Sequence, residues 1–145
     1  MWRSLLFGIQ HNAGTNPGLL LIRLFAGLAM ALSHGLRKVP PSDRFVQSVS
    51  DIGFPAPEWF AWMAGLSEFV GGMFIAIGFC TRPSAFFLTI TMLVAAFGRH
   101  GAEAFGAQEK ALLYAVMALF LLIQGPGKYS VDYLIHKKLH STSSE

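Results

Sequence analysis

The chain has 145 residues, of which 53% are hydrophobic and only 13% are charged, and its mean hydropathy is +0.49. A soluble domain of this size needs more polar surface than these residues provide, so the composition excludes an ordinary soluble protein. The formal net charge of +3 comes from basic residues that are dispersed along the chain, which argues against a nucleic-acid-binding face. The single cysteine, Cys80, excludes an internal disulfide and a dithiol redox pair.

Four apolar segments follow one another along the chain and predict membrane-spanning helices, because each approaches the roughly 20 residues that a bilayer requires. We expect these helices over about 16–38, 57–79, 82–100 and 107–124. Pro17, Pro57 and Pro83 lie where helices would begin, the position at which a missing backbone N–H costs least. The short connection GFCTRP makes the second and third helices antiparallel neighbours.

The linker between the first two helices, RKVPPSDRFVQSVSDIGFPAP, carries apolar residues at a helical spacing, namely Phe45, Val49 and Ile52. This pattern predicts a short helix that lies on the membrane surface or caps the bundle, with an ordinary loop as the alternative. The expected fold class is therefore all-α. We expect one transmembrane domain over 1–140, built as an integral membrane four-helix antiparallel bundle, and a disordered serine-rich tail at 141–145.

Glu68 stands alone as an acid in the second apolar segment, some ten residues from either end and hence near the middle of the membrane. Small residues recur around it at spacings of three and four, namely Ala61, Gly65, Gly72 and Ala76. Such a stripe lets another helix approach closely, so the carboxylate is expected to face protein and not lipid. A charged group at this depth costs about 2.5–3.5 kcal/mol, so Glu68 must be paired, neutralised or hydrated.

Arg23 is the expected partner of Glu68, because its long side chain can span the axial offset of about 7 Å that helix geometry gives between them. The alternative is an ion pair that only sets the register of two helices. Other ionisable residues gather toward the side of the membrane opposite the termini: His34, His100 and Glu109. A set of ionisable groups inside a membrane protein indicates a functional site.

Five segments of the chain carry a family resemblance, in the order RLFAGLAMALSHGLRKV, GFPAPEWFAWMAGLSEFVGGMFIAIGFCTRPSAF, RHG, EKALLYAVMALFLL and GPGKYSVD. Together they resemble the DoxX family over roughly residues 17–133. The resemblance implies a four-helix protein of the bacterial inner membrane, in a family whose named members are linked to quinol oxidation or quinone-coupled redox complexes. It also implies roles for the polar motif positions Arg23, His34, Gly35, Lys38, Glu68, Gly72, Arg82, His100, Glu109, Gly125, Gly127 and Asp132.

The ionisable residues suit a quinone or quinol as the bound cofactor, because histidine and a desolvated carboxylate exchange protons near neutral pH. We take Glu68, His34, His100 and Glu109 as proton-active candidates, and Arg23, Lys38, Arg99 and Trp62 as ligand-binding candidates. Lys38 and Arg99 would stabilise an anionic form of the ligand, whereas an aromatic residue such as Trp62 is also typical of a membrane-interface anchor. The chain has no flavin, haem or dithiol motif, so a redox partner protein must supply the electrons.

Three function classes remain open at this point. The first is an accessory or anchor subunit of a quinone-linked redox system, the second a small proton-coupled transporter, and the third a scaffold whose buried ion pair is purely structural. No Glu-x-x-His pair is present, which argues against a di-iron centre. We assign no residues to a metal site. The expected partner is the lipid bilayer, and a homo-oligomer is compatible with the sequence.

The orientation in the membrane depends on the basic residues of the loops. The two sides carry five each, so the positive-inside rule decides only if the residues near the expected site are discounted. Discounting Lys38, Arg99 and Lys110 places the termini in the cytoplasm. 

Overall fold

The computed structural model describes residues 15–141, and every regular element in this range is helical. The elements are α2 (Thr15–Ser33), η1 (Gly35–Lys38), α3 (Asp43–Asp51), α4 (Pro57–Ile77), α5 (Thr81–Val94), η2 (Ala95–Arg99), α6 (Phe105–Gln124) and α7 (Val131–Ser141). Four segments are long and apolar enough to cross a membrane: Asn16–Lys38, Pro57–Ile77, Thr81–Arg99 and Phe105–Gln124. The predicted all-helical architecture with four spans is confirmed.

The ends of the helices differ from the expected bounds by a few residues. Helix α4 ends at Ile77 and not at 79, because Gly78 adopts a left-handed φ of 73° and its N–H closes the last turn. Helix α6 begins at Phe105, two residues before the expected start. Helix α7 was not predicted, and it includes Ser141 of the expected tail. The other tail residues, 142–145, lie outside the described part of the chain.

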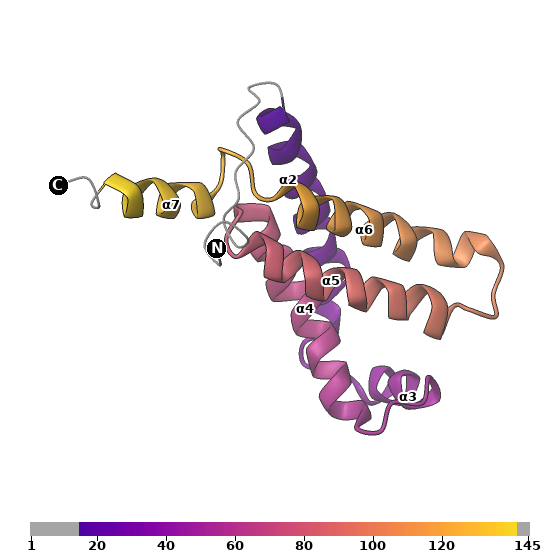
Figure 1. Cartoon of the computed structure of the whole chain (residues 1–145). Coiled ribbons are helices and arrows are strands. Elements are labelled where there is room, and N and C mark those ends of the chain that lie inside the picture. The colour runs from indigo at the N-terminus through magenta and orange to yellow at the C-terminus, as the bar shows by residue number, and fades with distance from the viewer. Residues whose placement is uncertain (1–14, 142–145) are drawn as a thin grey trace.

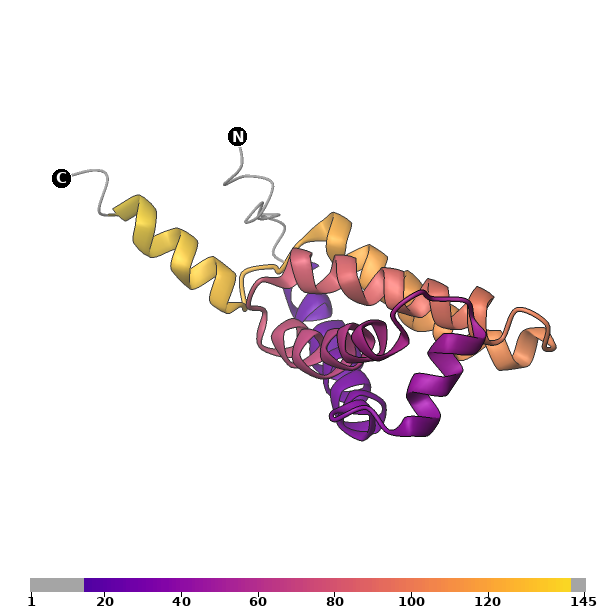
Figure 2. The same cartoon turned by 90° about the horizontal axis from the view of Figure 1, so that it is seen from below.

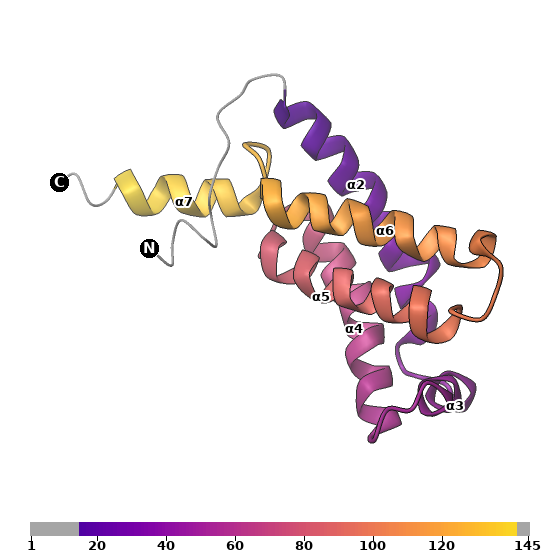
Figure 3. The same ribbon diagram turned by 45° about the vertical axis from the view of Figure 1, so that its right-hand side comes forward.

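The four spans form two antiparallel pairs, α2 with α4 and α5 with α6 (Figure 1). The pairs meet at the tight turn between α4 and α5, and they diverge toward the opposite side, where α3 lies beside α4 (Figure 3). We call the side with the α4–α5 turn the terminal side and the side with α3 the loop side. Helix α7 starts on the terminal side and points away from the spans (Figure 2).

Small residues build the contact between α2 and α4. A Cβ atom on Gly27 would lie 2.6 Å from the carbonyl oxygen of Gly72, and one on Gly72 would lie 3.0 Å from the backbone nitrogen of Ala31. Backbones approach this closely in lipid only where side chains are absent or minimal. The predicted stripe of small residues on α4 is therefore confirmed as a helix-packing surface.

Helix α3 confirms the short helix that was predicted in the linker. The hydroxyl of Ser42 caps its first turn by accepting a hydrogen bond from the N–H of Phe45 at 3.4 Å. Val49 is buried, whereas the charged residues of α3 are exposed. An amphipathic helix of nine residues thus covers the loop-side end of the space between α4 and α5.

Candidate functional site

Glu68 is buried inside the α4 packing surface, with 1% of its side chain exposed, as the sequence predicted. Its partner is Lys38 at the end of η1, whose Nζ lies 2.6 Å from Oε1 and 2.8 Å from Oε2 of the carboxylate. The predicted pairing of Glu68 with Arg23 is wrong. We call Lys38 and Glu68 the loop-side pair.

The register between α2 and α4 explains the correction. A Cβ on Gly35 would touch the backbone of Phe69, and one on Gly78 would lie 2.8 Å from Nη1 of Arg23. Arg23 is therefore level with Gly78, ten residues beyond Glu68, or about 15 Å along the helix axis. On the terminal side, the start of α2 extends past the end of α4. The predicted offset between Arg23 and Glu68 was counted from the helix ends and assumed that these ends are level.

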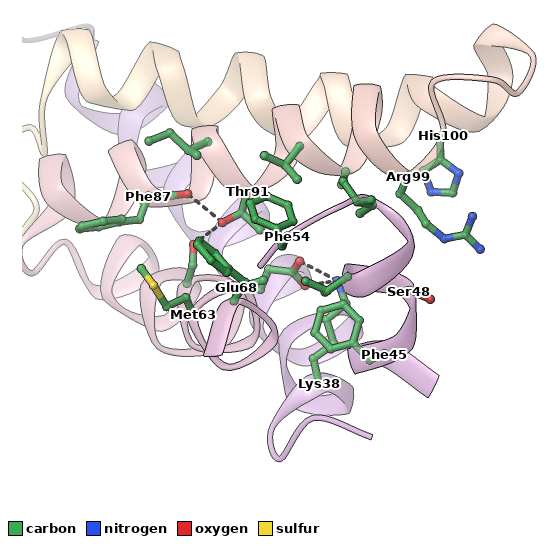
Figure 4. Close-up of a pocket in the computed structure, with 18 residues that line it drawn as sticks. Lys38, Phe45, Ser48, Phe54, Met63, Glu68, Phe87, Thr91, Arg99 and His100 are labelled. Carbon is green, nitrogen blue, oxygen red and sulfur yellow. Dashed lines mark hydrogen bonds and ion pairs between the residues drawn. The ribbon is translucent and has the colours of Figure 1, made fainter. Parts of the chain in front are cut away.

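A cavity of about 490 Å³ lies between α3, α4 and α5, directly beside the loop-side pair (Figure 4). Its walls are largely apolar and include four phenylalanines, Phe45, Phe54, Phe60 and Phe87. The ring of Phe45 also faces the ammonium of Lys38, with Nζ 5.1 Å from its centroid. The cavity therefore combines flat apolar surfaces with one buried, charged pair.

The other polar groups of the cavity lie at two places. Beside Glu68, the hydroxyls of Ser67 and Thr91 lie 3.1 Å apart and join α4 to α5. At the loop-side end, Arg99 and His100 border the cavity (Figure 4). The Nδ1 atom of His100 lies 2.9 Å from Oε1 of Glu103, a surface carboxylate that is also 3.9 Å from Arg99.

The structure brings together only half of the candidates from the sequence: Glu68, Lys38, Arg99 and His100 line the cavity. The other four lie elsewhere. His34 packs edge-on against the ring of Tyr114, with centroids 5.6 Å apart, and Glu109 is exposed on α6. Trp62 lines a separate shallow hollow, and Arg23 belongs to the terminal side.

Several residues of the cavity were missed by the sequence analysis. Ser67 and Thr91 carried a usable signal, because each is a hydroxyl within an apolar span at a depth near Glu68. Phe45 and Phe54 lie in the linker, and nothing in the sequence indicated that they line a cavity. Their positions depend on how α3 folds back onto α4.

A second buried polar cluster, which we call the terminal cluster, holds the chain after α6. The guanidinium of Arg23 donates to the backbone carbonyls of Pro126 and Tyr129. Asp132 accepts hydrogen bonds from the N–H of Cys80 at 2.8 Å, from the N–H of Thr81 at 3.0 Å and from its hydroxyl at 2.9 Å. The carboxylate thereby caps the start of α5 and stabilises its unbonded N–H groups.

The terminal cluster offers little reactive chemistry. None of its residues lines the cavity. Burial, and then the negative charge of Asp132, raise the pKa of the Cys80 thiol, so this thiol stays protonated at neutral pH. Within residues 15–141, no three His, Cys, Asp or Glu side chains are grouped to hold a metal ion.

Comparison with known proteins places the chain in a family. Residues 18–101, which include the loop-side pair and all the residues that line the cavity, match the DoxX family. The membrane protein Rv3486 of Mycobacterium tuberculosis is 32% identical, over 90% of this chain and 88% of its own length. The inner membrane proteins YqjF and YphA of Escherichia coli are 35% and 33% identical, over 67% and 80% of this chain and 74% and 89% of their own lengths.

No solved structure is significantly similar to the chain. The family match covers more than half of the sequence, and the relatives named as inner membrane proteins agree with the four spans. The chain therefore belongs to the DoxX family and is a multi-pass inner-membrane protein.

Proposed function

We propose that the cavity binds the headgroup of a quinone or quinol, and that the protein is an accessory or anchor subunit of a quinone-linked redox system. The observation that carries this proposal is the meeting of aromatic walls with the loop-side pair inside a membrane span. A quinone headgroup is a flat apolar ring with two carbonyl oxygens, and it needs this combination of surfaces.

The size and shape of the cavity support the proposal. Its volume of about 490 Å³ lies within the range of roughly 300–1,000 Å³ that is typical of small-molecule sites. Phe45, Phe54, Phe60 and Phe87 supply flat surfaces against which a ring can pack. A largely apolar wall with a few placed polar groups is the usual composition of such sites.

Lys38 is the natural donor to a ligand carbonyl. An ammonium has three N–H groups, and two of them are directed at the oxygens of Glu68. The structure assigns no acceptor from residues 15–141 to the third. A carbonyl oxygen can accept that hydrogen without breaking the loop-side pair, while Glu68 keeps the ammonium in place.

Reduction of a quinone to a quinol consumes two electrons and two protons. In this proposal a partner redox protein delivers the electrons, since the chain carries no flavin, haem or dithiol motif. The residues of the chain bind and orient the ring, hold a proton at Lys38, and exchange protons with water through the imidazole of His100 at the loop-side end.

We also propose that the termini lie in the cytoplasm. Lys38 is engaged with Glu68 and so counts less as a loop charge, whereas Arg99 and Lys110 are exposed and still count. The terminal side then carries the larger number of basic residues, Arg3, Arg82, Lys128, Lys137 and Lys138. A reporter fused to the C-terminus that is active only in the cytoplasm should be active, and its silence would contradict this orientation.

The test is to extract the protein from its own membranes in a mild detergent and to quantify co-purifying quinones by mass spectrometry. The wild type and Glu109→Gln, whose site is exposed and outside the cavity, should both retain quinone. Lys38→Met should retain at least about tenfold less, the equivalent of about 1.4 kcal/mol. Equal retention by Lys38→Met, or none by the wild type, would overturn the proposal.

A further inference from the structure

We propose that the ligand enters the cavity sideways from the bilayer, between α4 and α5, and leaves a long apolar chain among the lipid acyl chains. The inference rests on the proposed function for the headgroup. It adds the class of ligand: an amphiphile whose chain is too long for the cavity and stays outside it.

Three residues carry the argument, because each lines the cavity and is also exposed. Met63 of α4 is 38% exposed, and Phe87 and Ile90 of α5 are 50% and 44% exposed. All three lie within membrane spans, so their outer surfaces face acyl chains and not water. The same side chains thus form a wall of the cavity and part of the lipid-facing surface.

The aromatic residues at the deep end of the cavity continue this surface outward. The ring of Phe87 packs edge-on against Phe86, with centroids 5.5 Å apart, and Phe86 is itself exposed. Figure 4 shows Phe87 and Met63 together at one end of the cavity and Arg99 with His100 at the other. An apolar chain that leaves past Phe87 and Met63 meets apolar groups throughout.

The other exits are less suitable for a chain. Helix α3 covers one side with the buried Val49, and its neighbour Ile52 packs so closely on η2 that a Cβ at Gly98 would lie 2.9 Å from it. The loop-side end carries Arg99 and His100. An apolar chain that passed between charged groups into water would lose the hydrophobic stabilisation that the bilayer provides.

The packing of α4 on α5 explains why a gap exists at this depth. The two helices are joined by a tight turn on the terminal side and diverge toward the loop side (Figure 3). At the level of Glu68 the small side chains of Ser67 and Thr91 join them through a hydrogen bond of 3.1 Å. The opening therefore faces the leaflet on the loop side, and the chain of the ligand should lie in that leaflet.

The test uses two photoreactive analogues of one quinone, with the reactive group either on the ring or partway along a long saturated chain. The full-length protein is reconstituted in liposomes, irradiated with each probe, and mapped by mass spectrometry. The ring probe should modify residues near Lys38 and Thr91, and the chain probe should modify Met63, Phe87 or Ile90. Excess unlabelled quinone should suppress both, whereas chain-probe labelling of the lipid-facing Leu113 should not respond.

Failure of this inference and failure of the proposed function give different results. If the chain probe labels Ile52 or Arg99 and unlabelled quinone suppresses this labelling, the lateral opening is wrong, while the proposal of quinone binding still holds. Labelling by both probes that unlabelled quinone never suppresses would overturn both proposals.

A pair of variants gives an independent measurement. Ile90→Trp should obstruct the opening and weaken binding of a long-chain quinone about tenfold, while a chainless analogue binds within about twofold of wild type. The matched control is Leu93→Trp, because Leu93 is exposed on the same helix and does not line the cavity. Equal loss for both analogues, or equal loss in both variants, would contradict the lateral opening.

Discussion

The terminal cluster and the loop-side pair each bury an acid almost completely, but they differ in what surrounds that acid. Arg23 and Asp132 are 1% exposed and are bonded to backbone groups of the chain itself. Glu68 is also 1% exposed, but Lys38 is 29% exposed and borders a cavity. Burial of a charge in a membrane protein therefore does not by itself indicate a binding site, and the loop-side pair differs from the terminal cluster in that it borders a cavity.

The difference also separates two uses of a buried charge. The terminal cluster joins residues far apart in the sequence, because Asp132 bonds Cys80 and Thr81 at the start of α5, and Arg23 of α2 bonds the segment before α7. The loop-side pair joins two neighbouring helices that small residues already pack together. We expect the first to govern folding and the second to govern binding.

The largest effect is expected from Asp132→Ala. The substitution removes three hydrogen bonds and the negative charge that interacts with the buried Arg23, so the free energy of unfolding should fall by about 3–5 kcal/mol. Unfolding with a denaturing detergent in mixed micelles measures this change. Asp43→Ala, at an exposed position in α3, serves as the control, and it should change the midpoint of the detergent unfolding curve little. Similar midpoints for the two variants would show that the terminal cluster does not stabilise the fold.

The next effect concerns the helix contact that connects the two regions. Gly27→Ala places a methyl group 2.6 Å from the carbonyl oxygen of Gly72, so the unfolding free energy should fall by about 1–3 kcal/mol. Gly18→Ala is the matched control on the same helix, because its added methyl would contact no other part of the protein within 4 Å beyond the backbone of its own helix and its chain neighbours. The same unfolding titration compares them, and an equal response would mean that α2 and α4 are not tightly packed at Gly27.

A smaller change in stability is expected when both members of the loop-side pair are replaced. The double variant Lys38→Met/Glu68→Leu leaves no unpaired charge, so it should unfold within about 1 kcal/mol of wild type. Retention of quinone during purification should nevertheless be lost. A double variant that keeps both stability and quinone would favour the scaffold interpretation, in which the pair only sets the register of the helices.

The smallest effect is expected at the loop-side end of the cavity. Glu103→Gln breaks the surface contacts to His100 and Arg99, and exposed ion pairs contribute only about 0–1 kcal/mol. Unfolding midpoints and quinone retention should both stay close to wild type. Marked loss of quinone in this variant would move the binding determinant from the loop-side pair to Arg99 and His100.

Much of the fold followed from local patterns. Apolar length predicted the four spans, and the small residues around Glu68 predicted that its carboxylate faces a neighbouring helix. The spacing of Phe45, Val49 and Ile52 predicted α3. These features depend on the periodicity of one helix and on the cost of burying a charge in lipid, so neighbouring residues are sufficient to reveal them.

The candidate site was only half predictable. Lys38 and His100 were named for the right side of the membrane, but His34 and Glu109 on the same side face away from the cavity. Depth in the membrane can be counted along a helix, whereas the direction of a side chain around the bundle depends on which helices are neighbours. The divergence of α4 from α5 creates the cavity, and the sequence of either helix alone shows no pattern that predicts it.

By itself, the sequence determined that this protein spans the membrane four times and turns one acid inward at mid-depth. Only the tertiary structure decided that Lys38 and not Arg23 meets Glu68, and that Arg23 instead holds the segment before α7. The physical reason is register: sliding one helix along another does not alter the apolar character of either. Contacts such as Gly27 on Gly72 set that position, and they exist only once the helices are packed.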